Sequence, residues 1–265
     1  MMDLATLEPW IRLGVFTAML GTLALWERVA PRRVQVYPRA WRWANNLAMV
    51  VVNTILLRAL FPVAAVGAAL LAEEAGWGLF NQAELRLAWS IPLTILILDF
   101  SIWAQHLLFH RIPVLWRLHR MHHADLEIDA STGLRFHPVE IVLSMLLKIA
   151  VVIVLGAPAV AVLIFEVLLN ATALFSHSNL RLPAKVDAAL RWVIVTPDMH
   201  RVHHSWHPQE TDSNFGFNLS WWDRLFGTYV DQPRDGHERM TIGLREFRDL
   251  SDLRLDRMLV QPFRE

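Results

Sequence analysis

Long apolar stretches, separated by short polar segments, occupy most of the first 180 residues. The stretches long enough to form membrane-crossing helices cover residues 10–26, 47–71, 87–108 and 141–175. The last is about twice the length that one membrane helix needs, and Gly156 and Pro158 are turn signals in its middle. We therefore expect two antiparallel helices there, and overall an all-α, polytopic membrane bundle of about four to five membrane helices.

The remainder of the chain is polar and mixed in character. Its pattern predicts an amphipathic helix over 184–195, a loop-rich segment over 200–229 and a surface helix over 244–259. No linker, repeat or low-complexity segment separates these parts from the apolar helices. We expect a single membrane domain, 1–265, with N-terminal membrane helices in 1–86, a His-rich region in 87–230 and a cytosolic C-terminal tail in 231–265. A cytosolic His-rich helical cap is expected to cover the membrane helices.

The composition agrees with a membrane protein, because 54% of the residues are hydrophobic and only 19% are charged. Lys and Arg together number 25, and so do Asp and Glu. The chain thus lacks the basic excess of a nucleic-acid-binding protein, and we expect no nucleic-acid partner. It contains no cysteine, which excludes disulfide scaffolds, Cys-ligated zinc, iron–sulfur clusters and thiol catalysis.

The basic residues are unevenly distributed among the loops. Residues 27–42 contain five Arg and one Glu, whereas residues 71–86 contain three Glu and one Arg. By the positive-inside rule, the N-terminus lies outside and the loops after the first and third helices lie in the cytoplasm. Some of the cytoplasmic arginines could also form a docking face for an acidic electron-transfer protein, although contact with lipid phosphates is the simpler interpretation. These arginines are Arg32, Arg33, Arg117 and Arg120.

Eight of the twelve histidines form three tight groups. They are His106 and His110; His119, His122 and His123; and His200, His203 and His204. Spacings of three and four residues place side chains on one face of a helix, so each group can direct several imidazoles to one point. Imidazole is the commonest metal ligand among side chains. Because one ion takes about four to six ligands, the groups predict two metal ions.

Four other histidines are less clearly placed. His177 lies where the apolar hairpin returns to the face that carries the three groups, and we expect it to be a ninth ligand. His137 precedes a proline and an acid that are typical of a first helical turn. It is either the cap of the fourth helix or a further ligand or ligand partner. We expect His207 and His237 to lie in a solvated loop and tail.

Acidic and amide side chains precede two of the histidines by about two or three complete helical turns, which places them on the same helix face. Polar groups at membrane depth face the interior of a bundle, and metal-bound histidines donate their second N–H to such groups. The candidates for ligands, ligand partners or cavity-lining groups are Asp99, Glu166, Asn170 and Asn179. An ion pair between Lys148 and Glu166 is the alternative role for that carboxylate.

Several other functional classes fit the sequence less well. The chain has no Glu-x-x-His pair, which soluble di-iron bundles require, and no serine-hydrolase, P-loop or dinucleotide motif. A metal-binding or metal-transporting membrane protein would spread its ligands through the bilayer. A zinc-dependent membrane hydrolase needs only three protein ligands and an open position, fewer than the histidines that gather here.

The three histidine groups, with apolar helices between them, resemble the fatty acid hydroxylase / sterol desaturase superfamily. The resemblance covers about Ile95 to Tyr229 and extends to three short segments, Arg135–Glu140, Phe175–Asn179 and Trp222–Tyr229. Members are integral membrane, non-haem, usually di-iron oxygenases that hydroxylate or desaturate lipids with O2 and two electrons. Some branches carry a further histidine pair where only His177 stands here, so His137 could complete the set.

The resemblance implies a ligand set, a substrate class and partners. The implied ligands are His106, His110, His119, His122, His123, His177, His200, His203 and His204. They would hold two Fe ions, which zinc can replace in purified protein, with O2 as co-substrate. The substrate would be a membrane lipid of sterol or fatty acyl type. Because no cytochrome b5 domain is fused, a separate ferredoxin, cytochrome b5 or reductase would supply electrons. The compact form resembles bacterial members, with the active site on the cytoplasmic face of the inner membrane.

Overall fold

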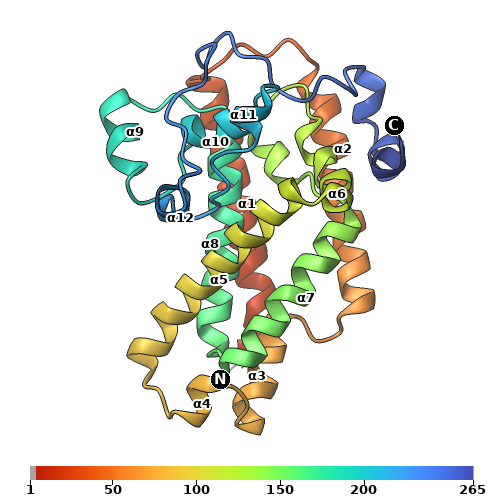
Figure 1. Cartoon of the computed structure of the whole chain (residues 1–265). Helices are drawn as coiled ribbons and strands as arrows, with labels where there is room; N and C mark the ends of the chain where they lie inside the picture. The colour runs from red at the N-terminus through yellow and green to blue at the C-terminus, as the bar shows by residue number, and fades with distance from the viewer. Residues whose placement is uncertain (1–3, 265) are drawn as a thin grey trace.

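Five candidate membrane spans run through the molecule, and short helices and loops form a cap at one end (Figure 1). The computed structural model describes residues 4–264. The chain is all-helical, and no β-strand occurs between residues 4 and 264. The long helices are α1 (Leu4–Val29), α2 (Arg39–Leu60), α5 (Leu87–Arg111), α7 (Pro138–Leu155) and α8 (Ala159–His177). The prediction of an all-α, polytopic membrane bundle is confirmed.

The shorter helices connect the spans or build the cap. Those outside the cap are α3 (Ala65–Ala75) and α4 (Leu79–Gln82). Those at the cap end are α6 (Pro113–His123), η1 (Ala130–Leu134), α9 (Ala184–Leu190), α10 (Pro197–His203), α11 (Pro208–Thr211), α12 (Trp221–Leu225), η2 (Leu250–Leu253), α13 (Leu255–Val260) and η3 (Gln261–Phe263). The N-terminus lies at the end of the bundle opposite to the cap (Figure 1).

The predicted hairpin within 141–175 is present. Gly156 ends α7 with a φ of +63°, a left-handed conformation that glycine adopts without strain. A Cβ on the neighbouring Gly78 would lie only 2.0 Å from the backbone nitrogen of Gly156. Two backbones therefore meet at the hairpin tip, and side chains at these positions would force them apart.

Three predicted helices differ from those in the structure. The apolar stretch 47–71 is not one helix, because α2 ends at Leu60 and α3 begins at Ala65, with Pro62 between them. The amphipathic helix expected over 184–195 ends at Leu190. The surface helix expected over 244–259 is replaced by a 3-10 turn at Leu250–Leu253 and a short α-helix at Leu255–Val260, which are separated by the extended backbone of Arg254. Phe247, with a φ of +57°, lies outside any helix.

The main apolar core lies where α3, α5, α7 and α8 meet. Its buried members include Val66, Leu98, Val152 and Phe165, one from each of these helices. The burial and dense packing of these apolar side chains stabilise the arrangement of the helices. This core fixes α5 and α8, which carry histidines at their cap ends, relative to each other.

One buried ion-pair network crosses the bundle at membrane depth. Glu166 on α8 accepts from Lys148 Nζ on α7 at 2.7 Å and from Arg12 Nη1 on α1 at 2.8 Å. Asn170 donates to the Glu166 backbone carbonyl one turn earlier. The structure therefore supports the ion-pair role for Glu166, with Arg12 as a partner that spacing did not indicate.

We expect Glu166→Gln to lower the free energy of unfolding by about 3 kcal/mol, because it leaves the buried Lys148 ammonium without its counter-charge. Thermal unfolding in detergent measures the change. The matched control is the double variant Lys148→Met/Glu166→Gln, which removes both charges while Arg12 keeps its contact with Glu8. The double variant should be more stable than the single variant, and equal stability of single variant and unmodified protein would contradict the prediction.

Candidate metal centre

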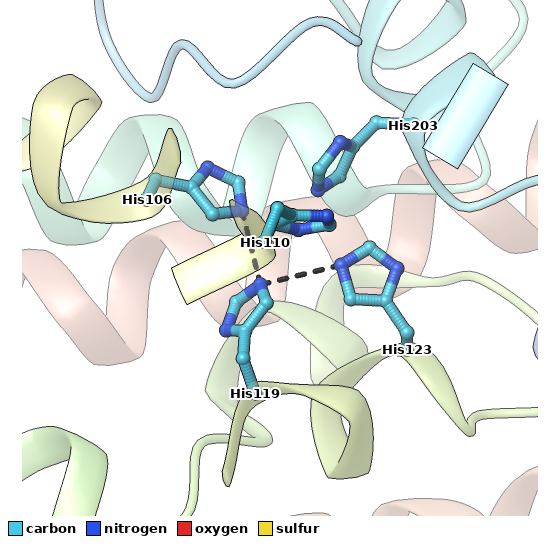
Figure 2. A group of neighbouring side chains, drawn as sticks. All are labelled: His106, His110, His119, His123 and His203. Carbon is cyan, nitrogen blue, oxygen red and sulfur yellow. Dashed lines mark hydrogen bonds between the residues drawn. The ribbon is translucent and has the colours of Figure 1, made fainter. Parts of the chain in front are cut away.

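All nine predicted ligand histidines meet beneath the cap, in two adjacent groups. The first histidine group contains His106, His110, His119, His123 and His203, and the second contains His122, His177, His200 and His204. Within each group, one ring nitrogen of every histidine lies within 4.8 Å of the others. All nine side chains are buried. Figure 2 shows the rings of the first group converging from α5, α6 and α10.

The sequence spacing explains how neighbouring histidines enter different groups. Residues four apart differ by only about 40° around a helix, whereas residues three apart differ by about 60° and adjacent residues by about 100°. His119 and His123 therefore enter one group, and His200 and His204 enter the other. His123 therefore joins the first group and His122 the second. In the same way, His203 joins the first group and His204 the second. The repeated pattern His-x2-His-His thus supplies ligands to two sites from one short helix.

Both helices that carry this pattern begin with proline, which suits a first helical position. Pro113 starts α6 directly after α5 ends, and Pro197 starts α10. The side chain of Thr196 caps α10 by accepting from the Met199 backbone N–H at 3.3 Å. These signals place the histidines of α6 and α10 against the cap ends of α5 and α8.

Distances between ring nitrogens fit metal coordination. Nε2 of His119 lies 3.0 Å from Nε2 of His106 and 3.2 Å from Nε2 of His123 (Figure 2). In the second group, Nε2 of His177 lies 3.0 Å from Nε2 of His200. Two imidazole nitrogens bound about 2.1 Å from one ion at right angles would be about 3 Å apart. The nitrogens therefore stand where ligands of a common ion would stand.

Backbone carbonyls hold several rings by their outer nitrogens. Nδ1 of His106 donates to the Phe215 carbonyl at 2.7 Å, and Nδ1 of His203 donates to the Ser213 carbonyl at 2.6 Å. Nδ1 of His177 donates to the Ala173 carbonyl at 2.7 Å. Because a carbonyl can only accept, Nδ1 carries the proton and the Nε2 lone pair is free to bind a metal.

Two further rings are held by carboxylates. Nδ1 of His119 lies 2.7 Å from Glu140 Oε1, and Nδ1 of His110 lies 3.3 Å from Asp212 Oδ1. A carboxylate behind a histidine is the usual arrangement at metal sites, where it orients the ring and increases its basicity. Glu140 appeared in the sequence only as a first-turn acid of a helix, and Asp212 carried no sequence signal.

Several buried ring nitrogens have no hydrogen-bond partner within residues 4–264. In the two histidine groups they are Nε2 of His110, Nε2 of His203, Nδ1 of His200 and both nitrogens of His204. Buried polar atoms are normally satisfied. A metal ion in each group would satisfy the inward-facing nitrogens, so the donor set fits two metal ions.

Burial also keeps these rings neutral. Desolvation, followed by repulsion from neighbouring imidazolium rings, holds the pKa of several histidines in the cap well below its usual range. These are His122, His123, His200, His203 and His204. Neutral imidazole is the form that binds a metal.

Arg42 of α2 fixes the loop that follows α6. Its guanidinium contacts both oxygens of Asp125 at 2.8 and 2.9 Å and Asp129 at 2.6 Å, and all three side chains are fully buried. Burial alone would raise the pKa of Asp125, but the Arg42 charge outweighs it and lowers that pKa to about 2. The same loop ends at Arg135, whose carbonyl accepts from Nδ1 of His122 at 3.1 Å. Arg42 therefore supports the second histidine group from a distance.

Asp223 holds the backbone segment that orients a histidine of the first group. Its carboxylate accepts from the backbone N–H groups of Phe215 and Gly216, both at 2.8 Å, and from Trp103 Nε1 at 3.1 Å. Phe215 is the residue whose carbonyl holds His106. Asp223 lies in the segment Trp222–Tyr229, which the sequence singled out only through its resemblance.

The remaining sequence candidates lie outside both groups. Asp99 accepts from Trp222 Nε1 at 2.8 Å and from the Leu219 N–H, and it contacts no clustered histidine. Asn179 hydrogen-bonds the backbone of Arg33. Like Glu166, these two side chains therefore join elements of the fold, whereas Asn170 bonds within its own helix. The expected contact of these four side chains with the histidines is absent from the described residues.

The other histidines are placed as follows. His137 caps α7, because its Nδ1 accepts from the Val139 N–H at 3.2 Å. The capping alternative for this residue therefore agrees with the structure. The expectation that His237 is solvated is wrong, since it is only 5% exposed and its Nε2 lies 3.6 Å from Asp198 Oδ2. His207 is half-buried and contacts Asp235 at 2.7 Å.

We expect Glu140→Ala to weaken metal binding at the first histidine group by roughly 10–100-fold, because His119 loses the carboxylate that orients it. Glu140→Gln should retain much of the affinity, since its amide oxygen can still accept from Nδ1. Metal titration of the purified variants measures both values. Equal affinity in the alanine variant and the unmodified protein would show that Glu140 does not support the site.

Comparison with known proteins identifies the family. The family described as fatty acid hydroxylase matches residues 91–228. An ornithine lipid hydroxylase of Rhizobium tropici is 27% identical over 229 residues, which cover 83% of this chain and 67% of that protein. An alkylglycerol monooxygenase of Xenopus tropicalis is 30% identical over 169 residues, 62% of this chain but 36% of that protein. A cholesterol 25-hydroxylase-like protein of Danio rerio is 27% identical, with 54% of this chain and 57% of that protein covered. No solved structure matches the chain.

The matched region contains more than half of the chain and every histidine of both groups. Its cap end holds the buried imidazoles, and its apolar helices form most of the candidate spans. The chain therefore belongs to the fatty acid hydroxylase family and is a multi-pass membrane oxygenase of that family.

Proposed function

We propose that the chain hydroxylates a membrane lipid in an O2-dependent reaction at a pair of iron ions. One oxygen atom of O2 enters a C–H bond and the other leaves as water, with two protons and two electrons from a separate donor consumed. The observation that carries the proposal is the convergence of nine buried imidazoles into two adjacent groups.

The histidines would hold the metals through their inward-facing nitrogens, five from the first histidine group and four from the second. A bound iron pair supplies the redox chemistry that activates O2 and cleaves an unactivated C–H bond. The protein's own part is to keep each ring in one tautomer and orientation through the partners behind it. The buried, largely apolar surroundings exclude bulk water from the reaction.

Two phenylalanines support an approach of the lipid chain from the bilayer side. Phe136 stacks on His122 with ring centroids 4.5 Å apart, and Phe217 lies 5.0 Å from His106. Both rings are only partly buried, and Phe217 also packs against the main apolar core of the bundle. An acyl or alkyl chain that reaches the metals along these rings would remain in apolar contact throughout.

The relatives favour hydroxylation over desaturation. An ornithine lipid hydroxylase, alkylglycerol monooxygenases and a cholesterol 25-hydroxylase-like protein are all named for the insertion of oxygen. Ornithine lipids are the first substrates to test, because the match to that relative covers 83% of this chain. Sterols and alkylglycerols are the next substrates to test.

Two other functions fit the structure less well. A metal transporter would place ligands along the depth of the bilayer, whereas both groups lie at one end of α5 and α8. A zinc hydrolase needs only three protein ligands, so most of the nine imidazoles would not bind the metal. We also propose, from the distribution of arginines, that the cap faces the cytoplasm of a bacterial inner membrane and the N-terminus lies outside.

The test is to supply the iron-loaded protein in lipid vesicles with a chemical reductant, isotopically labelled O2 and each candidate lipid. We expect a product that carries one labelled oxygen atom and is absent under anaerobic conditions. Labelled oxygen in no product, or lipid cleavage that proceeds without O2, would contradict the proposal and favour a hydrolase.

A further inference from the structure

An exposed apolar surface on the cap has no role in the site described above. We define the cap patch as Trp192, Val193, Trp221, Leu225 and Phe226, which come from the turn after α9 and from α12 and its C-terminal end. Leu225 is 70% exposed and Trp192 is 64% exposed. Trp221 Nε1 donates to the Trp192 carbonyl at 2.9 Å, which joins the two segments. Large exposed apolar patches mark contact with another apolar surface.

The cap patch continues the lipid-facing surface of a membrane helix. Phe226 packs on Trp103 and Phe100 of α5, with ring centroids 4.7 and 5.9 Å apart. Trp222, next to the patch, lies 5.1 Å from Phe100 and donates to Asp99. Phe100 is itself 36% exposed and belongs to the candidate membrane span formed by α5. The patch therefore adjoins the candidate membrane span through aromatic contacts.

The position of the contact along the α5 axis places the cap patch alongside the candidate span, and not beyond its end. Phe100 lies eleven residues before Arg111, where α5 ends. At about 1.5 Å per residue, the contact with α12 is about 16 Å along the helix axis from that end. Figure 1 shows α12 at the lower edge of the cap, alongside the bundle. A bilayer that covers the apolar part of α5 would reach α12.

The charges around the cap patch suit a lipid surface. The acidic side chains of α9 and α12, Asp187 and Asp223, are both buried. Lys185 is exposed, and the Arg224 guanidinium lies 4.3 Å above the ring of Trp192. Within these two helices no carboxylate is exposed, so the accessible side chains are apolar or basic. Tryptophan, phenylalanine and leucine beside basic residues are typical of a segment that lies in the membrane interface.

We propose that the cap patch inserts into the lipid leaflet that borders the cap, so that α12 is an interfacial membrane element. The occupant of the patch is a phospholipid surface. Insertion fixes the height of the cap relative to the leaflet, and Asp223 on the buried side of α12 links that element to the backbone that orients His106. The proposal does not depend on which lipid is oxidised.

Site-directed labelling tests the insertion directly, because the chain contains no cysteine. Leu225→Cys and Trp192→Cys each provide one thiol for an environment-sensitive fluorophore in the full-length protein, reconstituted in phosphatidylcholine vesicles. Gln209→Cys on α11 is the control, since it is exposed and lies nearer the top of the cap (Figure 1). Quenching by nitroxide-bearing phospholipids reports contact with lipid, and quenching by iodide reports contact with water.

We expect labels at 225 and 192 to be quenched several-fold more by nitroxide lipid, and several-fold less by iodide, than the label at 209. Equal iodide quenching at 225, 192 and 209 would overturn the proposal. Protection from iodide that depends on protein concentration and is unaffected by nitroxide lipid would also overturn it, because a second copy of the chain would then cover the patch.

Discussion

Replacing His203 by alanine is expected to abolish turnover and to remove bound metal from the first histidine group. His203 supplies one of the five imidazoles of that group, and its Nε2 has no other partner among the described residues. Its loss leaves four rings in that group. It also removes the contact between α10 and α5, since the His203 ring centroid lies 4.6 Å from that of His106 and 4.7 Å from that of His110. Elemental analysis and product formation on the purified variant measure the two effects.

His122→Ala makes the same test for the second group, because His122 connects to His177 through Nε2 atoms 3.1 Å apart. The matched control is His207→Gln, a histidine outside both groups that contacts Asp235. The control should keep its metal and its activity. If either alanine variant remained active with a full complement of metal, the histidine groups could not be the catalytic centre.

Arg42→Met is expected to lower the free energy of unfolding by about 5 kcal/mol, the upper part of the range for breaking a buried ion pair. The variant leaves two carboxylates, Asp125 and Asp129, buried without the cation that neutralises them. Because the loop that they stabilise ends at the carbonyl that orients His122, metal binding at the second histidine group should weaken as well. Thermal unfolding in detergent and metal titration measure these consequences.

The control for Arg42 is an arginine whose ion pair is exposed. Arg254 pairs with Asp256, and both side chains are more than half exposed. Arg254→Met should change the free energy of unfolding by less than about 1 kcal/mol, since solvent screens such pairs. Similar effects in the two variants would show that the buried network does not stabilise the loop.

The membrane helices and the histidine groups could be predicted from the sequence because both depend on local spacing. Apolar runs identified the candidate spans, and Gly156 marked the hairpin. Intervals of four residues place His106 with His110, His119 with His123 and His200 with His204, but the spacing did not indicate that each His-x2-His-His segment is divided between two groups. These periodicities are properties of single helices, so they require no knowledge of tertiary contacts.

Other features depend on contacts between distant segments. The carbonyls of Phe215 and Ser213 that hold two histidines are backbone groups, so the residue types at these positions do not predict the contacts. Arg42 appeared as one of several loop arginines, although it is fully buried against a loop some 80 residues later. Arg12 proved to be a partner of Glu166 across 154 residues. Only the packing of the bundle brings such groups together.

The candidate partners of the ligands show the same limit. Asp99 lies seven residues before His106, and this spacing predicted contact with the metal ligands. In the structure Asp99 binds Trp222 of α12, because the cap folds back along α5 and presents an indole N–H there. The spacing placed the carboxylate on an interior helix face, but it could not identify which neighbour would occupy that face.

The most direct test of the paired centre is the metal content of the detergent-purified protein, expressed with iron and handled without chelators. The geometry predicts two metal ions per chain, which the proposed function takes to be iron, with loss of metal in both His203→Ala and His122→Ala. If zinc occupies the site after expression, reconstitution with iron precedes the assay. One metal ion or none in folded, iron-reconstituted protein would contradict the paired centre and, with it, the proposed oxygenase chemistry.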